Sequence, residues 1–183
     1  MGKRALLNVD YTIDFVAEDG KLTCGVPGQA IEEYIVSVTE EFIGAGDYVV
    51  FAIDAHAEGD ELHPESGLFP PHNIIGTKGR DLYGKLEAVY KKNKDKDHVY
   101  YFDKTRYSAF EGTDLELKLR ERGIDEVHIV GVCTDICVLH TAVDAYNKGF
   151  KIVVHKEGVA SFNQAGHDWA LSHFSDTLGG KVV

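Results

Sequence analysis

Short apolar runs alternate with amphipathic segments along this 183-residue chain. The runs are apolar at successive positions, which is typical of β-strands buried on both faces. We predict strands at 5–9, 48–53, 99–102, 127–132 and 152–154, and a last short strand at 181–183. Because strands buried on both faces belong to parallel sheets, the pattern favours helices on either side of the sheet.

Helical patterns lie between these runs. Apolar residues recur at helical spacing over 28–42 and predict one helix there. Thr113 followed by Glu116 has the form of a capping box, and Gly123 would end the helix that begins there. We predict further helices over 81–92, 135–148 and 164–178. Alternating strands and helices indicate βαβ units, and therefore an α/β fold with a parallel, doubly wound sheet.

The stretch 55–97 interrupts this alternation. It holds Pro64, Pro70 and Pro71, three of the four prolines of the chain, together with glycines, histidines and acids. Long irregular insertions in compact domains are usually functional or disordered. The length of the chain fits one domain, so we expect a single domain over 1–183 that carries this stretch as a loop insertion.

Composition narrows the class of protein. The net charge is -11, which disfavours nucleic acid and anionic membrane surfaces as partners. No apolar run approaches the ~18 residues of a membrane helix, and the first ten residues are too polar for a signal peptide. Three cysteines make a disulfide framework improbable. We therefore expect a soluble, reduced protein of the cytoplasm.

Polar residues follow each apolar run. Ligands bind at the carboxyl ends of the strands in open parallel sheets, so these residues are candidates for one shared site. They are Asp10 after the first run, Asp54 and His56 after the second, Asp103 and Lys104 after the third, and Cys133 and Cys137 after the fourth.

Cys137 is the candidate nucleophile. A position in the opening turn of the predicted helix over 135–148 favours a thiolate, and Lys104 would lower the pKa of the thiol further. The alternative is a small buried apolar residue, which most free cysteines are. Asp10 is either a helix cap or salt-bridge partner, or the general base for the thiol. The C-x3-C spacing of Cys133 and Cys137 is not that of redox pairs, and Cys24 is interpreted as structural.

A metal site is the second candidate. Asp54 and His56 are alternate residues leaving a strand, so both side chains can point to one ion. His63, Glu65 and His72 follow in the loop insertion. Imidazoles with carboxylates suit Zn²⁺, Fe²⁺ or Mn²⁺. The other histidines are interpreted as packing or surface residues: His98, His128, His140, His155, His167 and His173.

Four motifs resemble those of the bacterial nicotinamidases in the isochorismatase-like superfamily of cysteine hydrolases. Residues 133–142, Cys-Thr-Asp-Ile-Cys-Val-Leu-His-Thr-Ala, resemble the nucleophile motif. Residues 10–15 are similar to the opening D-x-x-x-D-F motif, and 103–110 to the lysine segment. Residues 54–56, 63–66 and 69–72 are similar to the metal segment. The motifs occur in the family's order over nearly the whole chain.

The resemblance implies a three-layer, six-stranded, mainly parallel sheet with helices on both faces, and hydrolysis of nicotinamide to nicotinate and ammonia for NAD salvage. It implies side activity on pyrazinamide, one divalent ion with Zn²⁺ preferred, a homo-oligomer (dimer or tetramer), and a cis peptide bond before Cys133. By this resemblance Cys137 is the nucleophile, Asp10 the general base and acid, and Lys104 the third member of the triad. The backbone N–H groups of Cys133 and Cys137 would form the oxyanion hole. The metal ligands would be Asp54, His56, Glu65 and His72, and the walls of the substrate pocket would be Phe15, Phe69 and Tyr107.

Two alternatives remain open at this point. One is a related cysteine amidase that acts on another small amide or ureide. The metal segment argues against it, because in the resembled family that ion binds a pyridine nitrogen. The other is a non-enzymatic metal-binding or thiol-sensing protein. It predicts responses to metal or oxidant without ammonia release, and it leaves the convergence of Asp10, Lys104 and Cys137 unexplained.

Overall fold

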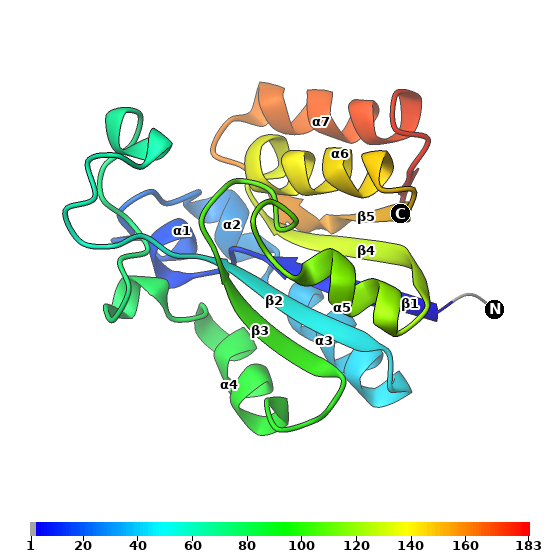
Figure 1. The fold of residues 1–183 in the computed structure, drawn as a ribbon. Helices are drawn as coiled ribbons and strands as arrows, with labels where there is room; N and C mark the ends of the chain where they lie inside the picture. Colours follow the sequence, from blue (N-terminus) through cyan, green and yellow to red (C-terminus); the bar gives the residue numbers. More distant parts are fainter. Residues whose placement is uncertain (1–2) are drawn as a thin grey trace.

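The computed structural model describes residues 3–183 and contains one six-stranded sheet (Figure 1). Its order is β3-β2-β1-β4-β5-β6, and every neighbouring pair is parallel. The chain winds outward in both directions from β1 and β4, which confirms the doubly wound sheet. The strands are β1 (Lys3–Val9), β2 (Tyr48–Asp54), β3 (Val99–Lys104), β4 (Ile124–Val132), β5 (Lys151–Ala160) and β6 (Lys181–Val182).

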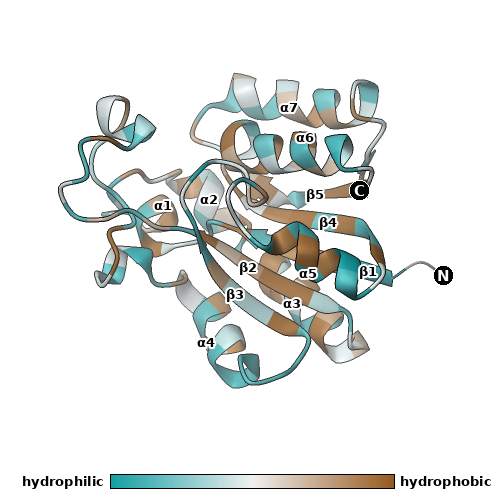
Figure 2. Ribbon diagram, in the orientation of Figure 1, coloured by the Kyte–Doolittle hydropathy of each residue, from teal (hydrophilic) through white to brown (hydrophobic). Residues whose placement is uncertain are grey.

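Helices cover both faces of the sheet. One face packs against α3 (Glu32–Ala45) and α4 (Gly84–Asn93), and the other against α5 (Leu115–Glu121), α6 (Leu139–Asn147) and α7 (Gln164–Asp176). Along β1, Ala5 and Leu7 belong to one core cluster and Leu6 to the other. Figure 2 shows the apolar strands between the two layers. Among residues 3–183, no helix is long and apolar enough to cross a membrane.

Two of the predicted helices are wrong in detail. The segment 28–42 does not form one helix, because a short α2 (Val26–Ala30) ends at Ala30, and Ile31 separates it from α3. The predicted capping box at Thr113 is also wrong. The Thr113 hydroxyl donates to the carbonyl of Ala109 at 2.7 Å, α5 begins two residues later, and Glu116 pairs instead with Lys148 at 2.8 Å.

The two segments that lead to the site differ from the predicted helix and strand. Residues Thr134–Val138 form a π-helical turn before α6, so Cys137 lies in this turn and not in the first turn of an α-helix. Single π turns within helices often occur at functional sites. Strand β5 extends to Ala160, well beyond the predicted end at 154.

Strands β1 and β4 approach closely at Gly131, which is paired with Val9. Gly131 has φ +122°, and a Cβ atom there would overlap the carbonyl oxygen of Val9. Only glycine fits this conformation and this separation. The absence of a side chain at Gly131 therefore lets β1, which leads to Asp10, and β4, which leads to Cys133, pack closely.

The segments that follow β1 and β2 contain the remaining short elements. Helix α1 (Ile13–Val16) follows β1 directly, and the insertion after β2 carries two 3₁₀ turns, Pro64–Gly67 and Lys78–Arg80. The insertion returns to the sheet edge, where His56 and Ile74 form a bridge.

Candidate active site and metal centre

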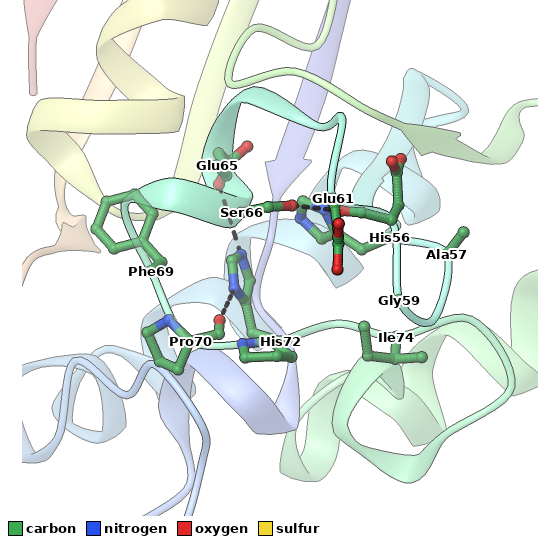
Figure 3. A pocket seen from close by; sticks show the side chains of 12 residues that line it. His56, Ala57, Gly59, Glu61, Glu65, Ser66, Phe69, Pro70, His72 and Ile74 are labelled. Carbon is green, nitrogen blue, oxygen red and sulfur yellow. Dashed lines mark hydrogen bonds and ion pairs between the residues drawn. The ribbon is translucent and has the colours of Figure 1, made fainter.

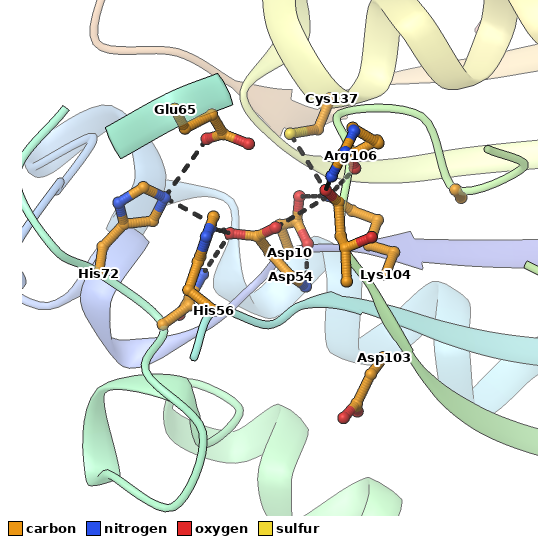
Figure 4. A network of polar contacts seen from close by, with 12 residues as sticks. Asp10, Asp54, His56, Glu65, His72, Asp103, Lys104, Arg106 and Cys137 are labelled. Carbon is orange, nitrogen blue, oxygen red and sulfur yellow. Dashed lines mark hydrogen bonds and ion pairs between the residues drawn. The ribbon is translucent and has the colours of Figure 1, made fainter. Parts of the chain in front are cut away.

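The carboxyl edge of the sheet gathers a buried cluster of charged side chains and a thiol (Figure 4). Asp10 follows β1, Asp54 and Lys104 end β2 and β3, and Cys137 lies beyond β4. Asp10 has φ 55°, a left-handed conformation that non-glycine residues rarely adopt and that is often found at functional sites. The structure thus brings together the predicted Asp10, Lys104 and Cys137.

Lys104 is the centre of this cluster. Its Nζ lies 2.7 Å from Asp10 Oδ2 and 3.7 Å from Cys137 Sγ, to which it donates. It also donates to the carbonyl oxygen of Arg106 at 3.0 Å. Asp10 Oδ1 accepts the backbone N–H of Asp54 at 2.8 Å. Asp10 and Lys104 are completely buried, so their attraction acts with little screening by water.

The protonation of the cluster follows from burial first and charge second. Burial raises the pKa of Asp10 to about 6, although Lys104 opposes the shift. Burial also raises the pKa of Cys137 well above its usual range, and Lys104 lowers it by less. The predicted lowering of the thiol pKa is therefore wrong, because burial outweighs the cation. Cys137 is a thiol at rest and needs a base, and Asp10 is well tuned to be one near neutral pH.

Four buried side chains form a candidate metal centre beside this cluster. Asp54, His56, Glu65 and His72 each offer a ligand atom, and these atoms all lie within 4.8 Å of one another. Asp54 Oδ2 lies 2.7 Å from His56 Nε2 and 3.4 Å from His72 Nε2, and Glu65 Oε2 lies 3.6 Å from the same His72 nitrogen. The other oxygen of Asp54 lies 3.7 Å from Lys104 Nζ, so one carboxylate joins the two clusters.

The orientation of these side chains fits a metal ion. His72 Nδ1 donates to the carbonyl of Pro70 at 2.8 Å, which orients the ring so that Nε2 faces the carboxylates of Asp54 and Glu65. This nitrogen is buried and has no hydrogen-bond partner among residues 3–183. Burial lowers the pKa of His72, but the nearby carboxylates of Asp54 and Glu65 raise it to about 10, so this nitrogen holds a proton when no ion is bound. The site therefore attracts a cation, and two imidazoles with two carboxylates suit Zn²⁺.

His63, also considered from the sequence, does not join the four. Its Nε2 donates to the carbonyl of Thr105 at 2.7 Å, and its Nδ1 accepts the backbone N–H of Glu65 at 3.2 Å. Both ring nitrogens are thus occupied, and His63 fixes the turn that presents Glu65.

Aromatic and apolar side chains surround Cys137. A small pocket contains Cys133, Cys137 and the three predicted walls Phe15, Phe69 and Tyr107. Glu65 and Phe69 also line a second cleft of about 210 Å³, together with His56 and His72 (Figure 3). The three pocket residues that the sequence analysis missed are Leu22, Ile136 and Phe162.

Phe162 could have been found by the rule that located the other residues. It lies two positions beyond β5, at the same edge of the sheet as Asp10 and Asp54. It was missed because the predicted strand ended at 154.

The neighbourhood of Cys133 agrees with the sequence in two respects. The peptide bond between Val132 and Cys133 is cis, as the resemblance implied. Cys24 is buried, with its sulfur 3.2 Å from that of Cys133, which fits its interpretation as a structural residue. Asp103, in contrast, points away from the cluster and pairs with Arg80.

The geometry agrees with what the chain is similar to. Residues 4–183 match the isochorismatase domain family, and the chain belongs to it. An uncharacterized isochorismatase family protein PncA of Bacillus subtilis (strain 168) is 69% identical over 181 residues, 99% of each chain. The crystal structure of nicotinamidase/pyrazinamidase PncA from Bacillus subtilis has a TM-score of 0.98 at 63% identity, with 99% of each chain covered.

A more distant structure contains a metal. Pyrazinamidase of Pyrococcus horikoshii in complex with zinc has a TM-score of 0.85 at 28% identity, with 99% of this chain and 98% of that chain covered. The six-stranded α/β fold predicted from the sequence is that of these relatives.

Proposed function

We propose that this chain is a nicotinamidase, an amidohydrolase that converts nicotinamide into nicotinate and ammonia for NAD salvage. The observation that carries the proposal is the single buried cluster in which Asp10, Lys104 and Cys137 converge and share Asp54 with a metal-ligand set. The similarity to nicotinamidase structures supports the same substrate class. Pyrazinamide has the same ring-nitrogen geometry, and we expect side activity on it.

The first half of the reaction needs a nucleophile and a place for negative charge. Asp10 takes the proton of the Cys137 thiol, and the sulfur attacks the carboxamide carbon. The backbone N–H groups of Cys133 and Cys137 receive the resulting oxyanion. Loss of one such donor typically lowers the rate by about 10²–10³. Lys104 keeps the charge of the cluster balanced while the proton moves.

The second half returns the enzyme to its starting state. Asp10, now protonated, gives its proton to the amide nitrogen, and ammonia leaves a thioester on Cys137. Asp10 then removes a proton from the incoming water. The tetrahedral intermediate collapses to nicotinate and the cysteine sulfur, which recovers its proton from Asp10. The pKa of about 6 suits Asp10 to both directions of transfer.

The metal ligands would position the substrate. Asp54, His56, Glu65 and His72 would hold one divalent ion, with Zn²⁺ preferred over Fe²⁺ or Mn²⁺. When bound, the ion supplies a Lewis-acidic contact for the pyridine nitrogen and so orients the ring. Phe15, Phe69 and Tyr107 form the walls against which a flat ring packs. A homo-oligomeric state and a place in the cytoplasm remain predictions.

Ammonia release from nicotinamide, pyrazinamide and benzamide by the purified, Zn²⁺-loaded chain tests the proposal. We expect turnover of the first two and a large loss with benzamide, which lacks the ring nitrogen. Cys137→Ala removes the nucleophile and should abolish turnover. Cys24→Ala deletes another buried thiol outside the reacting groups and serves as the matched control, with most of the activity retained.

Three outcomes separate the candidates. Zn²⁺ binding without ammonia release from nicotinamide, but with release from a ureide, would identify the related amidase. Zn²⁺ binding without release from any amide would favour the non-enzymatic protein. Near-normal turnover by Cys137→Ala would overturn the mechanism.

A further inference from the structure

Thr12, Asp14 and Asn73, which the reaction does not use, form a buried hydrogen-bonded group that we call the loop anchor. Asp14 Oδ2 accepts the backbone N–H of Asn73 at 2.8 Å, and the Thr12 hydroxyl donates to Asn73 Oδ1 at 2.9 Å. Thr12 and Asn73 are completely buried, and Asp14 is 6% exposed. The anchor links the segment after β1 to the loop insertion at Asn73, 61 positions beyond Thr12 in the chain.

Asn73 contacts three of the proposed ligands in three different ways. It directly follows His72 in the chain, and its carbonyl oxygen accepts the backbone N–H of His56 at 3.1 Å. Its side-chain Nδ2 lies 3.5 Å from Asp54 Oδ2, the oxygen that faces both histidines. Asn73 also has φ 45°, a conformation that asparagine tolerates better than most residues.

Asp14 holds Asn73 in this conformation. Its carboxylate accepts backbone N–H groups, and no Lys, Arg or His side chain within residues 3–183 forms an ion pair with it. It fits closely under the turn Lys78–Arg80, because a Cβ atom at Gly79 would overlap the Asp14 carboxylate. The role of the Asp14 carboxylate in the structure is therefore to accept hydrogen bonds from the backbone of the loops.

We propose that Asp14 and Asn73 are positioning residues of the metal centre, which hold Asp54, His56 and His72 in a ligating arrangement before an ion binds. The inference rests on the metal centre of the proposed function and adds residues that touch neither the ion nor the substrate. Loss of groups that orient metal ligands typically lowers metal affinity about 10–100-fold. We expect a decrease in this range when the anchor is broken.

A matched pair of buried Thr–Asn hydrogen bonds makes the test specific. Thr12 donates to Asn73 at 2.9 Å within the anchor, and Thr39 donates to Asn8 at 3.0 Å, where α3 packs on β1. Thr12→Val and Thr39→Val each remove one such bond from a fully buried threonine. The third variant, Asn73→Gly, removes the amide and keeps the backbone freedom that the left-handed conformation needs.

The measurement is Zn²⁺ affinity of the metal-stripped chain, by competition with a chromophoric chelator, together with thermal unfolding without metal. We expect Asn73→Gly to lower affinity about 10–100-fold and Thr12→Val to lower it by less. Thr39→Val should unfold at about the same temperature as Thr12→Val yet bind Zn²⁺ like the wild type. With Zn²⁺ saturating, KM for nicotinamide should rise more than kcat falls in Asn73→Gly.

Wild-type affinity in both folded anchor variants would overturn the inference, as would an equal loss in Thr39→Val. If Asn73→Gly fails to fold, the comparison of the two threonine variants decides. A wild-type chain that binds no Zn²⁺ would also overturn it. A chain that shows the expected order of affinities but releases no ammonia would overturn the proposed function and leave the inference intact.

Discussion

Two groups of buried titratable side chains lie on the same sheet, and they are built in opposite ways. The first is the cluster of Asp10, Asp54 and Lys104 at the carboxyl edge. The second is a chain of hydrogen bonds between β4, β5 and α3. In that chain His128 Nδ1 lies 2.8 Å from His155 Nε2, and His155 Nδ1 lies 2.9 Å from the hydroxyl of Tyr34.

The two groups differ in charge and in completeness. Burial lowers the pKa of His128 and lowers that of His155 to about 4, so both imidazoles are neutral at neutral pH. Its other end is closed by Glu126, 3.2 Å from His128 Nε2. In the site cluster, Asp54 Oδ1 and His72 Nε2 are left without hydrogen-bond partners among the described residues. Buried polarity that is neutral and satisfied stabilises a fold, whereas buried charge with unsatisfied atoms indicates a place for a ligand.

Removal of Lys104 should have the largest effect. Lys104→Met leaves two buried carboxylates without their cation, which typically destabilises a protein by about 3–5 kcal/mol. Asp10 would then stay protonated and could not serve as base, so turnover should fall at least about a hundredfold. Denaturant unfolding and ammonia release measure both effects. Lys85→Met, at an exposed ion pair with Glu33, is the control, and an equally small change in Lys104→Met would contradict the assignment.

Loss of the shared carboxylate should have an intermediate effect. Asp54→Ala removes an atom that faces both His56 and His72, so we expect lower Zn²⁺ content and a higher KM for nicotinamide. Chelator-treated wild type should behave similarly and recover when Zn²⁺ is added back. Asp103→Ala is the control, because this carboxylate lies on the neighbouring strand β3, pairs with Arg80 and points away from the site (Figure 4). A normal metal content in Asp54→Ala would count against the metal centre.

The hydrogen-bonded histidines His128 and His155 should make the free energy of unfolding depend on pH and should have little effect on turnover. The folded-state pKa of His155 is below its unfolded value of 6.5, so its stabilising effect is complete above pH 6.5 and is lost progressively as the pH falls toward 4. Over this range the loss approaches roughly 3 kcal/mol. The groups around His155 are His128, Tyr34 and, more distantly, Arg4.

His155→Gln tests this expectation by denaturant unfolding at pH 7 and pH 5. The variant should lose less stability between the two values than the wild type does. His173→Gln, on the outer helix α7, should keep the wild-type slope. Turnover at pH 7 should stay within about twofold in both variants, since neither residue lies at the carboxyl edge. If the free energy of unfolding of His155→Gln changes with pH as much as that of the wild type, burial does not keep His155 neutral.

Much of this site could be predicted because parallel strands end at one edge. Apolar runs located the strands, and the residues after four of them include Asp10, Asp54, Lys104 and Cys137. The fifth strand was cut short because its middle is polar: Lys156 and Glu157 are exposed, and β5 is irregular where it pairs with β4. The run of apolar residues ended there, and Phe162 was lost with it.

Two other features depend on three-dimensional packing that residue order does not reveal. The position of Cys137 near a helix start suggested an easily ionised thiol, but complete burial raises its pKa. The role of Asn73 is not visible in the sequence, because nothing in its neighbours indicates a contact with Thr12, 61 positions away. Burial and long-range hydrogen bonds decide such roles, and both appear only in the folded chain.

Gly131 has a consequence for how this protein can change. At Gly131, the absence of a Cβ atom sets the distance between β1, which leads to Asp10, and β4, which leads to Cys137. Any replacement, even alanine, would push β1 from β4 and widen the gap that a proton must cross. In laboratory evolution for new amide substrates, we expect the residues of the pocket walls to vary. We expect position 131 to remain glycine in every active variant.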